Sequence, residues 1–238
     1  MIFLRRRFQP GLWSIALTLA GVALFSGLGM WQLERAAFKD AVQQNYQQRL
    51  AEDYQRFDAD APLTDLEFRK LRLVGEFDNA HSLLLDNRIY QGKAGYEVLT
   101  PLRLAGSDRI LLVNRGWIAP GDSRQQLPQI LPPAPAASVE GIVSFADAGG
   151  YRLGEVRLGD DWPQLIPYID MPALQQQFSS ELLPLVLWMA EEQPGHYQRD
   201  WKPVWADPDK SRAYATQWFS FAVIAGILFL ILNLRKIE

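Results

Sequence analysis

Two long uncharged runs, one near each end of the chain, restrict what this 238-residue sequence can fold into. The first run is Gly11–Leu33, with 23 residues, and the second is Ala213–Leu234, with 22 residues. About 18 or more such residues are enough to cross the hydrocarbon core of a bilayer as a helix. The near-neutral mean hydropathy of −0.11 is therefore an average over two membrane spans and a polar middle.

The middle segment, residues 34–212, carries 26 acidic and 19 basic residues. Its net charge of −7 repels nucleic acid, so nucleic acid is not expected as a partner. Its 179 residues suffice for one domain with its own core. The absence of cysteine from the chain excludes disulfides, thiolate zinc sites, thiol nucleophiles and CxxC redox motifs.

Basic residues flank both spans on their outward ends. Arg5–Arg7 precede the first span, and Arg235 and Lys236 follow the second. Because cytoplasmic flanks of membrane spans are enriched in Lys and Arg, both termini are predicted to be cytoplasmic. The apolar core of a secretory signal is about 7–15 residues, shorter than the first run, which favours an uncleaved anchor over a signal peptide.

The first span begins too early to leave room for an Arg- and Ser-rich transit peptide, which favours a bacterial inner membrane over a mitochondrial precursor. The predicted segments are a cytoplasmic N-terminus (1–10), a first span (11–33), a periplasmic domain (34–212), a second span (213–234) and a cytoplasmic C-terminus (235–238).

Small residues four apart predict how the two spans pack together. The pairs are Ala16/Ala20 and Ala23/Gly27 in the first span and Ala222/Gly226 in the second. Such pairs let helix backbones approach in lipid. The alternative is that Ala and Gly are simply frequent in membrane spans.

Hydrophobic periodicity changes from helix to strand along the middle segment. Residues 36–57 predict an amphipathic helix that continues from the first span and ends before Pro62, with Phe38, Val42, Tyr46 and Leu50 on one face. Leu71–Phe77 alternates as a half-buried strand does. Further predicted strands are Ser82–Arg88, Gly95–Leu104, Ile110–Ile118, Val139–Phe145 and Leu183–Ala190, with a loop over 131–138 and a short helix over Met171–Ser180.

The predicted fold class is therefore a membrane α+β protein, in which two transmembrane helices flank a mostly antiparallel β domain with a few helices. Periodicity leaves open whether the sheet closes into a barrel.

No catalytic motif emerges from the sequence: there is no GxSxG, HExxH, GxxxxGK or GxGxxG pattern. The two histidines, His81 and His196, lie in turn contexts and are interpreted as ordinary surface histidines. The adjacent acids Asp160-Asp161 and Glu191-Glu192 point apart and are poor acid/base pairs. A membrane-anchored hydrolase is accordingly the weakest of the functional hypotheses.

An Asn-Arg pair follows two of the predicted apolar strands. Asn87 and Arg88 follow one strand, and Asn114 and Arg115, with Gly116 and Trp117, follow another. An arginine at such a place can bind carboxylates or phosphates of a partner with its two-pronged guanidinium. The alternative is a structural arginine that anchors loop carbonyls or an internal acid.

A Gln-Trp pair stands near the same membrane boundary in each span. Trp31 and Gln32 end the first span, and Gln217 and Trp218 lie near the outer end of the second, after Tyr214. An aromatic belt explains tryptophan at this depth. A pocket for a large planar or lipidic ligand is the alternative, because it also explains the glutamines.

Short motifs in a fixed order carry a family resemblance. They are Gly29–Arg35 (GMWQLER) with Lys39, Gly75–Phe77, Asn87-Arg88, Gly95-Tyr96, Leu99–Leu102, Asn114–Ile118 (NRGWI) and Tyr214–Phe219 (YATQWF). In this order, between two spans, they make the chain similar to the Surfeit-locus family of cytochrome c oxidase assembly proteins.

The resemblance implies a chaperone-like accessory protein, not an enzyme, that helps mature a haem-copper oxidase of the respiratory chain. It implies transient contact with haem A, oxidase subunits and the haem A synthesis machinery, in addition to membrane lipid. Trp31, Gln32, Tyr214, Gln217 and Trp218 are the candidate haem pocket, in which Arg35 or Arg212 would bind a propionate.

The chain departs from the family pattern at one position. Family members commonly carry His three residues before the Tyr of the last motif, and here that residue is Ser211. Serine is not an axial haem ligand, so no metal ligand is assigned. The alternative function is a periplasmic, membrane-anchored scaffold or sensor that binds protein partners without handling haem.

Overall fold

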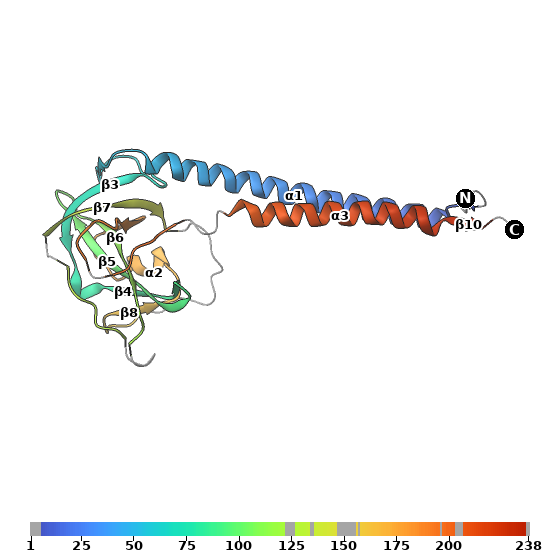
Figure 1. Cartoon of the computed structure of the whole chain (residues 1–238). Coiled ribbons are helices and arrows are strands. Elements are labelled where there is room, and N and C mark those ends of the chain that lie inside the picture. Colours follow the sequence, from blue (N-terminus) through green and yellow to red (C-terminus); the bar gives the residue numbers. More distant parts are fainter. Residues whose placement is uncertain are drawn as a thin grey trace. The chain divides into compact units, whose positions relative to one another are not determined.

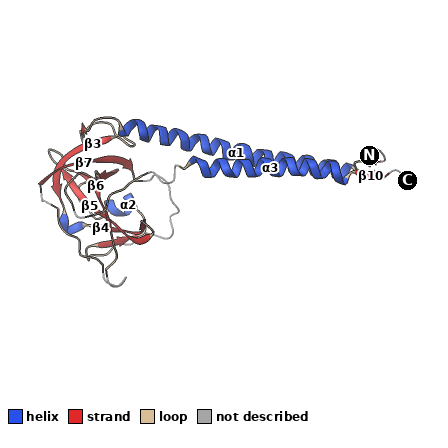
Figure 2. Ribbon diagram, viewed as in Figure 1, coloured by secondary structure: helices blue, strands red, loops and turns tan. Residues whose placement is uncertain are grey.

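The computed structural model describes residues 6–121, 127–133, 136–146, 156, 158–195, 197–202 and 207–236. The chain forms two compact units, a helical unit of Met1–Asn45 with Pro203–Glu238 and a barrel unit of Tyr46–Lys202 (Figures 1 and 2). His196, Asp122–Gln126 and Ala134-Pro135 are among the residues outside this description.

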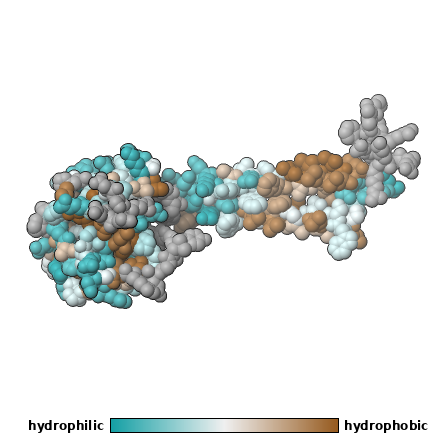
Figure 3. Space-filling view, turned by 90° about the horizontal axis from the view of Figure 1, so that it is seen from below, coloured by the Kyte–Doolittle hydropathy of each residue, from teal (hydrophilic) through white to brown (hydrophobic). Residues whose placement is uncertain are grey.

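Two long helices lie side by side in the helical unit, α1 (Leu12–Leu50) and α3 (Pro208–Leu232) (Figure 1). Only 6% of the most apolar 18-residue window of each helix is buried, so these are not core helices of a soluble fold. Apolar side chains cover the half of the pair that leads to the chain termini (Figure 3). Both helices are long and apolar enough to cross a membrane, as the sequence predicts.

The least exposed positions of α1 and α3 recur in steps of three and four, the 3.5-residue spacing of helices packed in a left-handed pair. We call these positions the seam: Ile15, Thr18, Val22, Phe25, Gly29, Gln32, Ala36 and Lys39 in α1, and Ser211, Ala215, Trp218, Ala222, Ala225 and Phe229 in α3.

The predicted small-residue contacts of the first span are wrong. Ala16, Ala20, Ala23 and Gly27 are all exposed, on the side of α1 away from the seam. The close approach occurs at Gly29, where an added Cβ would lie 2.7 Å from the Phe219 ring. The four-residue pattern failed because packing follows the 3.5-residue seam, in which ring contacts such as Phe25 on Trp218 dominate.

The barrel unit is a closed sheet of five strands, β3 (Lys70–Phe77), β7 (Ala136–Phe145), β9 (Glu181–Met189), β6 (Arg109–Ile118) and β5 (Lys93–Leu104). They are neighbours in this order, and β3 also pairs with β5, which closes the ring. Most pairs are antiparallel, as predicted, and the β6–β9 pair is parallel.

Shorter elements complete the unit. Strand β4 (Leu83–Tyr90) pairs with β5, and β2 (Gln55–Arg56) and β8 (Gln164–Ile166) add parallel edges to β3 and β4. A 3₁₀ helix η2 (Asn79–His81) precedes β4, and α2 (Met171–Gln175) precedes β9. The five strands predicted before residue 146 and the last strand are confirmed, and three residues of the predicted 131–138 loop belong to β7.

Apolar side chains fill the barrel and cover one outer side. The interior cluster includes Leu73, Leu102, Leu111, Val143 and Leu185, each no more than 1% exposed. A second cluster packs outside the ring between the strands, α2 and β8. Full burial of one such side chain is worth about 1.5–3 kcal/mol, which makes these two clusters the main stabilisation of the unit.

The helix predicted over 36–57 is confirmed only as far as Leu50. Gln55 and Arg56 instead form an edge strand beside β3. Phe38, predicted on the buried face, is 63% exposed, whereas Tyr46 is buried in a ring cluster with Phe68 and Trp201. Tertiary contacts of the barrel unit end the helix earlier than its own pattern does.

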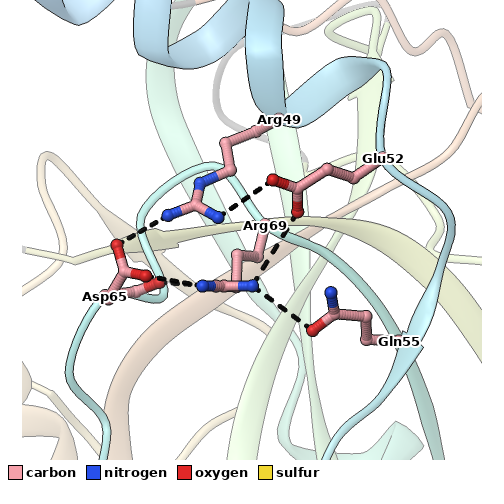
Figure 4. Close-up of polar contacts among 5 residues, drawn as sticks. All are labelled: Arg49, Glu52, Gln55, Asp65 and Arg69. Atoms are coloured by element: carbon pink, nitrogen blue, oxygen red, sulfur yellow. Dashed lines mark hydrogen bonds and ion pairs between the residues drawn. The ribbon is translucent and has the colours of Figure 1, made fainter.

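An ion-pair network forms where α1 ends earlier than predicted (Figure 4). The Arg49 guanidinium contacts Asp65 at 2.6 Å and Glu52 at 3.0 Å, and the Arg69 guanidinium contacts the other Asp65 oxygen at 2.5 Å. Arg69 and Arg49 lower the pKa of the Asp65 carboxyl by hydrogen bonding. The network fixes the end of α1 to the loop that leads into β3.

The predicted helix over 171–180 is also shorter, since α2 ends at Gln175. The Gln175 side chain accepts from the Leu182 backbone N–H at 2.7 Å and donates to the Ser180 carbonyl at 2.9 Å. It thereby satisfies the backbone groups between the helix and β9.

The seam predicts different effects for two neighbouring glycines of α1. Gly29→Ile drives a branched side chain into the Phe219 ring, and overpacking of this kind costs about 1–3 kcal/mol. Gly27→Ile is the matched control, because its Cβ meets nothing within 4 Å. We expect a lower thermal midpoint in detergent, followed by tryptophan fluorescence, for the Gly29 variant alone. Equal thermal midpoints of the two variants would contradict the placement of Gly29 in the seam.

Candidate functional site

The two Asn-Arg strands converge on one carboxylate that the sequence did not single out. Glu97 on β5 contacts the Arg88 Nε of β4 at 3.3 Å and accepts from the Asn114 Nδ2 of β6 at 3.0 Å. Its side chain is only 19% exposed. No sequence signal marks Glu97, because its partners reach it through strand pairing across β4, β5 and β6.

Burial sets the electrostatics of this group. Desolvation raises the pKa of the Glu97 carboxyl, and Arg88 and Asn114 oppose that rise only in part. The group is therefore an internal acid held by a cation and an amide. This is the structural alternative foreseen for Arg88.

Trp117 and Gly116 fasten the same three strands. The Trp117 indole Nε1 donates to the Arg88 carbonyl at 2.9 Å, and its ring lies over Gly95, where an added Cβ would come within 2.5 Å. Gly116 has φ +116°, and its N–H donates to the Asn114 Oδ1 at 2.9 Å. A Cβ at Gly116 would lie 2.5 Å from the Gln198 carbonyl oxygen.

Arg115 is buried, at 4% exposure, and its contacts are with neutral groups. Its guanidinium donates to the Thr100 hydroxyl at 3.3 Å and the Leu131 carbonyl at 2.5 Å, and lies 5.0 Å from the centroid of the Tyr197 ring. Burial lowers the pKa of Arg115. Among the residues described, no carboxylate pairs with it, so its contacts are those of an arginine that anchors a loop carbonyl.

The structure thus brings Arg88, Asn114 and Trp117 together around Glu97 and places Arg115 in a separate contact set. Asn87 belongs to neither. It is exposed, has φ +61°, and its backbone N–H donates to the adjacent Asp86 carboxylate at 2.6 Å.

The Gln-Trp pairs of the spans divide between the seam and the exposed surface. Gln32 and Trp218 are seam residues; Gln32 is 9% exposed, and Trp218 stacks on Phe25 with ring centroids 6.0 Å apart. Trp31 is 50% exposed, and Gln217 is exposed as well. The candidate residues therefore lie partly in the seam and partly on the exposed surface of the helix pair.

Four of these six residues, with Phe38, share one side of the helix pair. Trp31, Arg35 and Phe38 each precede a seam position of α1, and Tyr214 and Gln217 each precede a seam position of α3. In an antiparallel pair of right-handed helices, residues that precede seam positions project to the same side. We call this set, Trp31, Arg35, Phe38, Tyr214 and Gln217, the aromatic flank.

An ion pair on the other side of the helix pair supports this geometry. Asp40 and Arg212 each follow a seam position, so they belong on the opposite side, and they are joined there at 2.5 Å. Arg212 also contacts Asp209 at 2.8 Å, so its charge is already neutralised. On the aromatic flank, by contrast, the Arg35 guanidinium lies 5.6 Å from the centroid of the Trp31 ring. Among the described residues Arg35 has no ion-pair partner, whereas Arg212 has two.

His81 belongs to the barrel unit. Its Nδ1 lies 2.6 Å from the Asp78 carboxylate, and its ring meets the Trp162 ring edge to face at 4.8 Å. Within the described ranges, no group of three or more His, Cys, Asp or Glu side chains could hold a metal ion. His81 is held as a structural side chain of η2.

Comparison with known proteins identifies the family of the chain. The SURF1 family profile matches residues 19–223, which include most of α1, the whole barrel unit and the first two thirds of α3. The chain belongs to the SURF1 family.

Individual relatives agree with this membership. A SURF1-like protein of Mycobacterium tuberculosis is 26% identical over 233 residues, covering 92% of this chain and 82% of that protein. A SURF1-like protein of Dictyostelium discoideum is 36% identical over 103 residues, and surfeit locus protein 1 of Arabidopsis thaliana is 34% identical over 119. These last two matches cover 38% and 34% of those proteins.

Gly116 of this SURF1-family chain provides a test of the close packing that Gly116 and Trp117 make beside β4, β5 and β6. Gly116→Ala combines a strained φ with a Cβ pressed against the Gln198 carbonyl, and backbone strain alone costs about 1–3 kcal/mol. Gly106→Ala is the control, since Gly106 has φ +79° but open space around its Cβ. Urea unfolding of the purified proteins should show the larger loss for Gly116→Ala. Equal losses would mean that close packing at Gly116 adds nothing.

The Glu97 carboxyl predicts a pH effect on stability. The pKa of the Glu97 carboxyl is raised in the folded state. Its contribution to the free energy of unfolding is therefore fully present below the ordinary pKa of 4.5 and is lost as pH rises through the raised pKa. Glu97→Gln should remove this part of the pH dependence of the unfolding midpoint. Glu76→Gln, at an exposed position of β3, should leave the wild-type profile unchanged. An unchanged profile for Glu97→Gln would refute the assignment.

Proposed function

We propose that this chain is an assembly factor for a haem-copper cytochrome c oxidase. Its membership of the SURF1 family, known for cytochrome oxidase assembly, carries the proposal, because the match spans both helices and the barrel. The protein works as a chaperone without turnover: it binds the catalytic subunit of the oxidase while that subunit matures.

The proposed location is a bacterial inner membrane, with both termini in the cytoplasm and the barrel unit in the periplasm. Support comes from the two helices that are long and apolar enough to span a bilayer. Sidedness rests on Arg5–Arg7, Arg235 and Lys236 at the ends of the spans.

The aromatic flank is the proposed contact surface for the oxidase subunit and its haem A. Trp31 and Tyr214 remain about half exposed, at 50% and 45%, on one side of the helix pair. Haem A offers a flat apolar macrocycle and two propionates. The rings fit the macrocycle, and Arg35 fits a propionate through charge-assisted hydrogen bonds.

The helical unit does not fit axial haem ligation by histidine. Neither His81 nor His196 lies in its sequence, and Ser211, which stands where the family commonly has His, is 3% exposed in the seam. Haem A would therefore be contacted transiently through its face and propionates. The same observation favours a second candidate function, a membrane-anchored scaffold that holds oxidase subunits or the haem A synthesis machinery without haem.

Deletion of the gene, in a strain without paralogues, is expected to lower haem-copper oxidase activity and the haem A content of the enzyme. Complementation with Trp31→Ala/Arg35→Gln should restore less activity than wild type, because the flank loses a ring and its free cation. Trp13→Ala/Lys210→Gln is the matched control, removing an 89% exposed ring and an exposed cation elsewhere.

Absorption spectra of the protein purified after co-expression with haem A synthesis separate the two candidates. A haem spectrum that weakens in the Trp31/Arg35 variant supports haem handling. Oxidase loss in the deletion strain without any haem spectrum supports the scaffold. Unchanged oxidase in the deletion strain would refute the assembly function itself.

A further inference from the structure

The buried guanidinium of Arg115 lacks a counterion within the described part of the barrel unit. Its side chain is 4% exposed, and its contacts among the described residues are with neutral groups. Arginine is almost never fully buried unless its charge is paired, because an unpaired buried charge is costly. Burial lowers the pKa of Arg115, and the nearby charge of Arg199 lowers it further. The barrel therefore holds a cation that an external anion could neutralise.

Three neutral groups hold this cation. The guanidinium donates to the Thr100 hydroxyl at 3.3 Å and to the Leu131 carbonyl at 2.5 Å, and it lies 5.0 Å from the centroid of the Tyr197 ring. Thr100 belongs to β5, is fully buried, and has its Oγ1 3.1 Å from the Ser82 Oγ. The Thr100 contact is thus built into the barrel wall, whereas the carbonyl comes from a loop.

The loop segment that supplies this carbonyl is residues 127–133, which we call the strap. The Tyr197 hydroxyl accepts from the Leu131 N–H at 2.8 Å and donates to the Leu131 carbonyl at 3.4 Å. Ile130 packs against a buried apolar cluster that includes Tyr197. The side chains of Leu127 and Leu131 remain 36% and 41% exposed. The strap therefore presents a backbone carbonyl to the cation and leucine side chains to solvent.

A carboxylate in the place of the Leu131 carbonyl would supply the missing negative charge. A carboxylate oxygen accepts hydrogen bonds as a backbone carbonyl does, and a hydrogen bond between charged groups is roughly twice as strong as a neutral one. The planar guanidinium can also bind both oxygens of one carboxylate. Because a leucine backbone occupies the place now, the group that matches it and adds charge is the C-terminus of a chain that ends in an apolar residue.

We propose that Arg115 is a binding site for the free C-terminal carboxylate of a partner polypeptide that ends in an apolar residue. In the unbound protein the strap occupies the site with the Leu131 carbonyl, and the partner displaces it. The Thr100 hydroxyl keeps the guanidinium oriented in both states. The site is independent of the proposed oxidase function and of the aromatic flank.

The test uses the full chain in detergent and a peptide copied from the strap. Acetyl-Pro-Gln-Ile-Leu, the sequence of residues 128–131, is titrated with a free C-terminal carboxylate or as the amide, and binding is measured by calorimetry. The carboxylate form should bind and raise the unfolding midpoint, because a ligand of the folded state stabilises it. The amide form should bind about 10-fold more weakly, since it lacks the charge. Sodium 4-methylpentanoate, which has the leucine side chain and carboxylate without peptide groups, should also bind more weakly.

Two variants separate a ligand site from a purely structural arginine. Arg115→Gln keeps hydrogen-bond donors but loses the charge, and it should weaken binding of the carboxylate peptide about 10-fold. Tyr197→Phe keeps the ring beside Arg115 but releases the Leu131 peptide group, so the carboxylate peptide should bind about fivefold more tightly, the effect of one neutral hydrogen bond. Lys93→Gln, which removes an exposed cation of β5, is the matched control and should bind as wild type does.

The Tyr197→Phe variant keeps the test decisive if Arg115→Gln does not fold, because a purely structural contact predicts no gain in affinity. The unfolding midpoint of each variant without peptide verifies that it folds. Absence of binding by the carboxylate peptide, equal binding of the amide or of 4-methylpentanoate, or wild-type affinity in either variant would each overturn the proposal.

Discussion

Closure of the barrel depends on the double pairing of β3, which bonds to β7 on one edge and to β5 on the other. Gly75 lies at the point where both edges are occupied, opposite Leu104 and Ala137. An added Cβ there would strike the Arg103 carbonyl oxygen, so the close approach of β3 and β5 requires glycine. Without this contact the sheet would stay open, and its interior leucines would face water.

The closed ring sets the chemistry of the buried polar groups. Strand pairing carries Arg88, Glu97 and Asn114 to one point on β4, β5 and β6, whereas Arg115 is held by Thr100 and the Leu131 carbonyl. The partners of both sets come from within the barrel unit. In this unit Arg88 and the motif Asn114–Ile118 therefore stabilise the barrel, whereas Asn87 is exposed.

The helical unit is organised by its seam, which separates residues that pack from residues that remain available. Gln32 and Trp218 pack in the seam, and Trp31, Arg35 and Tyr214 project from it. The helix pair thus presents exposed aromatic side chains on one side and the Asp40–Arg212 ion pair on the other.

The sequence by itself determined the two long apolar helices, six strands of the barrel unit and the family, because apolar runs, alternation and short ordered motifs are local properties. It did not determine barrel closure, the early end of α1 at Leu50 or the role of Glu97. These depend on contacts between residues far apart in the chain, such as Arg49 with Asp65 or Glu97 with Arg88. Only the tertiary structure decided which motif residues are buried and which are exposed. Each span carries a Gln-Trp pair, yet the seam takes the glutamine of one pair and the tryptophan of the other, Gln32 and Trp218.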